Sequence, residues 1–201
     1  MAATVGHIAG LIWRSIAAPA QVGTAISRLG LPRDVLWMAL GLATVLSVLA
    51  MYLTGDAVAA IGPGPGQPGE PGPLANALIL GSMLVMTVFA LHFAGQALGG
   101  QGQFPAALAM VAWLEVVGMA LRLGCFALGL VLGPVFAGAL PILAAVMLGW
   151  IMLHFVRALH GFAGLGRAVA TLALAILGLG LGLMAILAAI DILSGGALHH
   201  V

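Results

Sequence analysis

Charge is almost absent from this sequence. Of its 201 residues, 63% are hydrophobic and only 5% are charged, whereas soluble domains carry about 25% charged residues. There is no lysine, so the clustered basic residues of a nucleic-acid interface are missing. No soluble fold of this size can hide so much apolar surface. The composition therefore predicts an integral membrane protein.

Alternation of polar and apolar residues is also missing. Strands of a transmembrane β-barrel alternate in this way, whereas the apolar runs of this chain are continuous. The single cysteine, Cys125, excludes an intrachain disulfide. The fold class that remains is an all-α polytopic membrane protein.

Five apolar segments are long enough to span about 30 Å of hydrocarbon, which takes roughly 20 helical residues. The predicted spans are about 35–54, 75–99, 105–131, 135–158 and 168–193. A segment at 1–34 precedes them, a Pro/Gly-rich outer loop occupies 55–74, and an outer tail occupies 194–201. The whole of 35–193 is thus predicted to form one transmembrane domain.

The placement of arginine predicts the orientation. Arg14, Arg28 and Arg33 precede the first span, and Arg157 and Arg167 flank the loop between the fourth and fifth spans. A cytoplasmic N-terminus followed by five crossings puts all five arginines on the cytoplasmic side, as positive residues prefer. The C-terminus then lies outside.

Residues 1–34 are predicted to form two short helices rather than a span. Apolar residues recur at helical spacing on both sides of Pro19, and proline suits the first turn of a helix. In one interpretation the helices lie in the membrane interface, with Trp13 and Arg14 at headgroup depth and Arg28 and Arg33 nearby. In the other they form a lead-in packed on the cytoplasmic face of the bundle.

Five ionisable residues within the predicted spans are the main candidates for function. They are His92 in the second, Glu115 and Arg122 in the third, His154 in the fourth and Asp191 in the fifth. Glu115 and Arg122 share a helix face about 10 Å apart, so we expect partners on other helices. Glu115 would meet His92 or His154, and Arg122 would meet Asp191 or extend to the membrane surface.

Two interpretations of this polar set remain open. It forms a pathway for protons or a small solute, or it forms interhelical hydrogen bonds that fix how the helices dock. The second is preferred, because transporters usually show more mid-membrane acids and discontinuous helices. No metal or other cofactor is predicted: His154 and His160 are six residues apart and do not share a helix face.

Small residues recur at four-residue spacing in the last span. Gly178 and Gly182 are followed by Ala185 and Ala189, and this spacing lets helices approach closely. We expect these residues to pack within the bundle rather than to form a dimer face.

The layout resembles the bacterial branch of the Yip (Ypt/Rab-interacting-protein-like) family over nearly the whole chain. "APAQVGTAI" (18–26) is similar to the family's proline-led helix before the first span, and "GGQGQFPAALAMVAWLEVV" (99–117) to its entry into the third span. Eukaryotic relatives are associated with Rab GTPases, vesicle traffic and membrane shaping. Their acidic-aromatic Gly-Pro motif is absent from this sequence, so GTPase binding is not expected.

The sequence thus predicts a non-enzymatic scaffold, assembly or membrane-organising protein of the Yip type. Its predicted location is a bacterial inner membrane, with the N-terminus cytoplasmic and the C-terminus periplasmic. Its expected partners are the lipid bilayer and other membrane proteins. Two alternatives remain open: a small-solute or proton-coupled transporter, and an accessory subunit of a larger membrane complex.

Overall fold

Seven helices make up the part of the chain that the computed structural model describes, residues 2–55 and 71–193. They are α1 (Ala2–Ala17), α2 (Pro19–Ser27), α3 (Arg33–Thr54), α4 (Pro73–Ala97), α5 (Phe104–Leu132), α6 (Pro134–His160) and α7 (Leu165–Leu193). These two ranges contain no strand. Helices α3 to α7 each contain a stretch long and apolar enough to cross a membrane. The predicted all-α polytopic fold is therefore confirmed.

The long helices begin and end close to the predicted span limits, and the residues at their ends explain why. Pro73 and Pro134 begin α4 and α6, and Pro105 is the second residue of α5. Proline is tolerated there because the first turn of a helix does not use its backbone N–H groups. Gly55 and Gly161 follow α3 and α6 in the left-handed conformation that ends many helices.

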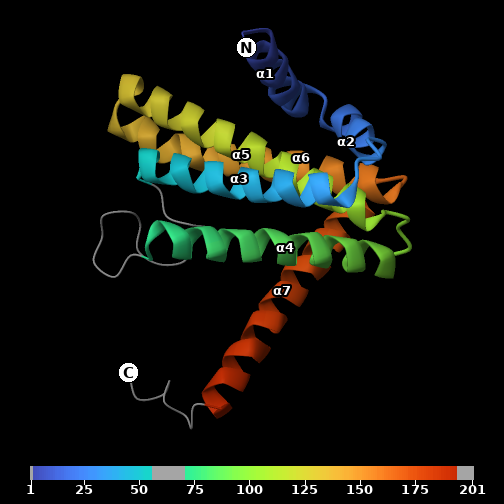
Figure 1. Ribbon diagram of the computed structural model, residues 1–201. Helices are drawn as coiled ribbons and strands as arrows, with labels where there is room; N and C mark the ends of the chain where they lie inside the picture. The colour runs from blue at the N-terminus through green and yellow to red at the C-terminus, as the bar shows by residue number, and fades with distance from the viewer. Residues whose placement is uncertain (1, 56–70, 194–201) are drawn as a thin grey trace.

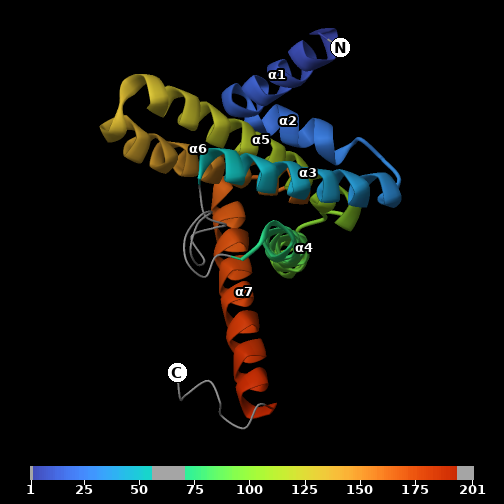
Figure 2. The same ribbon diagram turned by 60° about the vertical axis from the view of Figure 1, so that its left-hand side comes forward.

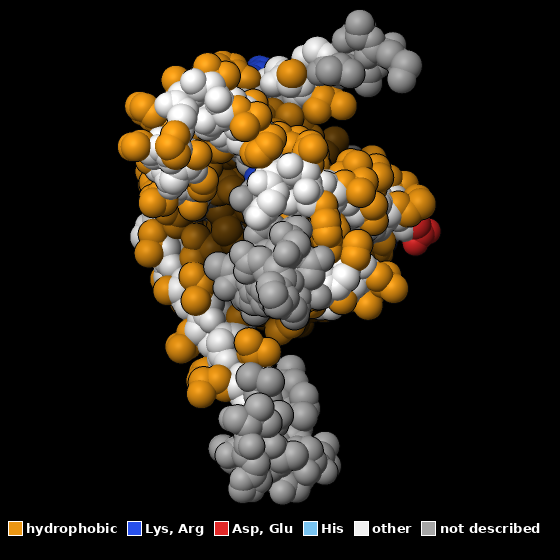
Figure 3. Space-filling view, turned by 90° about the vertical axis from the view of Figure 1, so that its left-hand side faces the viewer, with side chains coloured by type: hydrophobic (Ala, Val, Ile, Leu, Met, Phe, Trp, Pro, Cys, Tyr) orange, Lys and Arg blue, Asp and Glu red, His pale blue; other side chains and the backbone are white. Residues whose placement is uncertain are grey.

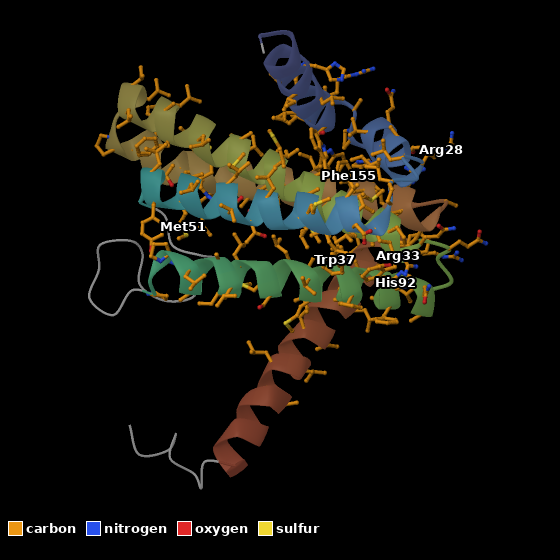
Figure 4. The ribbon with its side chains drawn as sticks, in the orientation of Figure 1. Arg28, Arg33, Trp37, Met51, His92 and Phe155 are labelled. Carbon is orange, nitrogen blue, oxygen red and sulfur yellow. The ribbon has the colours of Figure 1, made fainter. Side chains whose placement is uncertain are left out.

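Helices α3, α5 and α6 lie side by side, and α4 packs beneath α3 and crosses it at an angle (Figures 1 and 2). Successive helices from α3 to α6 alternate in direction (Figure 1). One end of this bundle carries the start of α3, the end of α4, the start of α5 and the end of α6. We call it the arginine end, because Arg33 and Arg157 lie there. Figure 4 shows Arg33 at this end and Met51 toward the opposite end of α3. Most of the predicted outer loop (55–74) and the predicted tail (194–201) lie outside the described residues.

The bundle is apolar both inside and outside. Its core contains fully buried side chains, including Val88 of α4, Leu108 and Val117 of α5 and Ile151 of α6. Figure 3 shows that hydrophobic side chains also cover most of the described outer surface on one face, where charged side chains are scarce. An apolar exterior around an apolar core suits a bundle whose solvent is lipid.

The two N-terminal helices lie against α5 and α6 near the arginine end (Figure 1). The helical conformation is interrupted between them at Ala18, which has non-helical backbone angles of φ −141° and ψ 59°. Pro19 explains the break, because its ring disfavours helical geometry in the preceding residue. The predicted pair of short helices ahead of the first span is therefore present.

Helix α7 leaves the bundle. Its first half packs on α4 and α6, where Ala168, Thr171 and Ala175 are buried. Beyond them the large side chains are exposed: Ile176 is 68% exposed and Met184 is 69% exposed. Both ribbon views show the helix running away from the other four at a steep angle (Figures 1 and 2).

Candidate functional site

A buried hydrogen bond ties α1 to α5. The hydroxyl of Ser15 donates to the carbonyl of Leu11 at 2.9 Å and accepts from Nε1 of Trp113, also at 2.9 Å. Ser15 is 0% exposed, and buried polar groups need such partners. The sequence offers no signal for Ser15, because a serine on an apolar helix face has many possible local partners.

A glycine lets α2 pack tightly on α6. A Cβ atom built on Gly23 would lie 3.1 Å from both the Ala158 Cβ and the Phe155 Cδ1 atoms. Beside it, Val22 and Ile26 are buried in the core. Figure 4 shows Phe155 on α6 beneath the N-terminal helices. Helix α2 is thus part of the bundle, whereas α1 is attached mainly through its last turns.

An apolar groove of about 340 Å³ lies between α1, α2 and Trp113. Its apolar lining includes Leu11, Ile26 and Leu29. Arg14 is the one charged residue among the described residues that line it. This volume falls within the range of about 300–1,000 Å³ that is typical of small-molecule sites.

His160 joins α6 to α4 and to the α4–α5 connection at the arginine end. The N–H of Gly102 donates to its Nδ1 atom at 3.3 Å, so the ring proton is on Nε2, which donates to the Leu91 carbonyl at 3.1 Å. The carbonyl of His160 also accepts from the N–H of Gln101 at 3.2 Å. His160 is 2% exposed. It is a structural join between α4, α6 and the α4–α5 connection.

Three glycines make room for this ring. A Cβ atom on Gly95 would overlap the imidazole of His160, and one on Gly100 or Gly102 would lie 2.5 or 2.7 Å from its Nδ1 atom. The sequence analysis considered His160 only as a metal ligand. The signal for its actual role was the cluster of glycines between the second and third spans.

Aromatic side chains gather around His92 near the same end. The ring centre of Phe104 lies 6.3 Å from Trp37, 5.0 Å from Phe89 and 5.7 Å from His92. Figure 4 shows Trp37 and His92 near Arg33. Trp37 and Phe89 are about 40% exposed, as interface aromatics commonly are.

The expected pairing of Glu115 with a histidine is wrong. Glu115 forms no hydrogen bond or ion pair within residues 2–55 and 71–193. Both ring nitrogens of His154 and the Nδ1 atom of His92 are buried without a hydrogen-bond partner in the same ranges. The rings contact aromatic side chains instead, with the centres of Trp150 and His154 4.5 Å apart.

The other two polar candidates lie farther from the arginine end. Arg122 is partly buried, two helical turns beyond Glu115 on α5. Asp191 belongs to the last turn of α7, and its side chain lies outside the described part. No group of three His, Cys, Asp or Glu residues that could hold a metal ion occurs among the described residues.

The expected packing of the glycines of α7 inside the bundle is also wrong. A Cβ atom on Gly178 or Gly182 would meet no atom within 4 Å among the described residues. Ala185 is exposed, and the side chain of Ala189 lies outside the described part. The reason is that α7 has already left the bundle at this point.

The predicted interfacial residues lie on the surface. Arg14, Arg28 and Arg33 are exposed, and Trp13 is 68% exposed. These exposed side chains and the groove make the N-terminal helices the main candidate site for contact with lipid or partners.

Comparison with known sequences identifies the family. Residues 13–187 match the Yip1 domain. This range runs from the end of α1 through the exposed part of α7. No curated protein and no solved structure matches the chain. The match to the Yip1 domain covers most of the chain, from the end of α1 to the exposed part of α7. This membrane protein therefore belongs to the Yip family.

Proposed function

We propose that this protein is a non-enzymatic membrane-organising scaffold of a bacterial inner membrane. Its arginine end faces the cytoplasm, its C-terminus faces the periplasm, and α1 and α2 act on the cytoplasmic leaflet. The observation that carries this proposal is the attachment of α1 to the bundle through Ser15 and Trp113. This attachment holds the exposed indole of Trp13 and the exposed guanidinium of Arg14 beside the membrane-embedded helices. Such an amphipathic helix inserts at the headgroup boundary.

The test is reconstitution of the full chain into vesicles of phosphatidylethanolamine and phosphatidylglycerol, with vesicle diameter measured by electron cryomicroscopy. Wild-type protein is expected to shift the population to smaller diameters in proportion to the amount of protein. Trp113→Phe removes a hydrogen bond worth about 1 kcal/mol and should reduce the shift by releasing α1. Trp13→Ser should reduce it by removing the inserted indole.

Trp150→Phe is the matched control, because Trp150 is 51% exposed on α6 and its ring contacts His154 rather than α1. It should leave the diameter shift unchanged. Equal vesicle diameters with wild type, Trp113→Phe and Trp13→Ser would refute the proposed action of α1.

Proton-coupled transport is the second candidate, and the unpartnered buried nitrogens of His92 and His154 favour it. Such groups call for an explanation, and a functional role is one. The same vesicles, loaded with a pH-sensitive dye, provide the test. A transporter would acidify them in response to a pH gradient, and Glu115→Gln or His154→Phe would abolish the flux. A scaffold would leave the gradient intact in all variants.

A role as an accessory subunit is the third candidate, and it is favoured by the exposed half of α7. Mass spectrometry after purification in native nanodiscs tests it. A partner at fixed stoichiometry would support the role, and recovery of the chain alone would count against it.

A further inference from the structure

The groove between α1, α2 and Trp113 has a charged residue in its largely apolar lining. Leu11, Ala25, Ile26 and Leu29 provide apolar walls, and Arg14 provides the one full charge among the described lining residues. No aspartate or glutamate is among them. The groove therefore combines an apolar space with a guanidinium, which prefers phosphate or carboxylate groups.

The depth of the groove follows from the length of α5. Its 29 residues rise about 43 Å, which exceeds the roughly 30 Å of hydrocarbon by about 13 Å. The end of α5 and the start of α6 contain no polar side chain between residues 126 and 149. Val131 and Val135 at their junction are about 80% exposed. We therefore place this apolar junction at the edge of the hydrocarbon, which leaves the surplus length at the arginine end.

The surplus length of α5 gives the depth of the groove in the membrane. Trp113 is nine residues beyond Phe104, the first residue of α5, and therefore lies about 13 Å along the helix. That distance equals the surplus, so Trp113 lies at the boundary between headgroups and acyl chains. Arg14 belongs to the same groove and thus lies at headgroup depth. Glu115, two residues beyond Trp113, lies close to this boundary rather than in the middle of the membrane.

We infer that the groove binds one anionic phospholipid of the leaflet at the arginine end. The headgroup phosphate accepts hydrogen bonds from the guanidinium of Arg14, and one acyl chain occupies the apolar space beside Trp113. Charge complementarity selects an anionic lipid, because the described part of this end carries Arg14, Arg28, Arg33, Arg157 and Arg167 against two acids, Asp34 and Glu115. Basic pockets at this depth bind anionic headgroups. The inference goes beyond the proposed scaffold function and does not depend on it.

The test uses the full chain in phosphatidylcholine nanodiscs doped with phosphatidylglycerol. Native mass spectrometry after release into mild detergent counts the phosphatidylglycerol molecules that each protein retains. Wild type is expected to retain one. Arg14→Gln should lower the apparent affinity about fivefold, as expected for one arginine at a membrane surface. Ala25→Trp fills the groove and should remove the retained lipid.

Two variants serve as controls. Arg28→Gln removes an exposed arginine that does not line the groove and should leave retention within twofold of wild type. Arg14→Lys keeps the charge on an exposed site and should keep most of the retained lipid, so it separates loss of binding from loss of folding. Gel filtration confirms that each variant remains monodisperse.

Three results would overturn the inference. Equal retention by wild type and Arg14→Gln would show that Arg14 does not hold the headgroup. An equal loss in Arg28→Gln would show that diffuse positive charge attracts the lipid. Retention of phosphatidylcholine as strong as that of phosphatidylglycerol would show that the groove does not select an anionic lipid.

Discussion

Replacing Gly95 by alanine is expected to lower the free energy of unfolding by about 2–4 kcal/mol, because the new methyl group would displace the ring of His160. The displaced ring would lose its hydrogen bonds to Gly102 and Leu91. At an unconstrained helical position the same substitution stabilises a protein by about 0.5–1 kcal/mol. The sign of the change is therefore diagnostic. Unfolding in mixed micelles, followed by intrinsic fluorescence, measures it.

Gly149→Ala is the matched control, because a Cβ atom at this position of α6 would meet nothing within 4 Å among the described residues. It should leave stability unchanged or raised. Combining Gly95→Ala with His160→Ala should cost less than the sum of the two single changes, since removal of the ring makes room for the methyl group. A Gly95→Ala protein as stable as wild type would contradict the join at His160.

Replacing Gly23 by leucine is expected to separate α2 from α6. Even a Cβ atom at Gly23 would lie 3.1 Å from atoms of Phe155 and Ala158, and leucine adds three more carbons. The expected cost is about 1–3 kcal/mol or more. Val22 and Ile26 would lose their cover. Hydrogen exchange of residues 19–27, read by mass spectrometry, should become about tenfold faster or more, because exchange follows the free energy of local opening.

The control for this variant is Gly10→Leu in α1, where a Cβ atom would have open space around it among the described residues. It should leave exchange in α2 unchanged. Slow exchange of residues 19–27 in Gly23→Leu, equal to that of wild type, would mean that α2 is not held by this contact.

The spans were predictable because each is specified by residues close together in the sequence. Continuous apolar runs of about 20 residues indicate membrane helices, and Pro73, Pro134 and Gly161 mark helix ends whatever the tertiary structure. The two N-terminal helices were predictable for the same reason, since Pro19 divides a helical pattern.

The contacts of the site were not predictable, because they depend on which helix faces meet. Gly95 and Gly178 are both helical glycines in apolar segments, yet one packs against His160 and the other meets nothing in the described structure. The pairing expected for Glu115 failed in the same way: His154 is on a neighbouring helix, but its ring packs on Trp150. Spacing along one helix predicts which residues share a face, but it does not predict the partner of that face.

The last two turns of α6 receive both attachments described above, with Phe155 and Ala158 under α2 and His160 under the α4–α5 connection. During synthesis the ribosome adds about 5–20 residues per second. The 58 residues between Gly102 and His160 therefore take roughly 3–12 s to appear. Throughout this interval α2 and the α4–α5 connection are already made but have no place to dock. The membrane domain consequently closes late and at one end, and lipid or a chaperone must cover Val22 and Ile26 until α6 arrives.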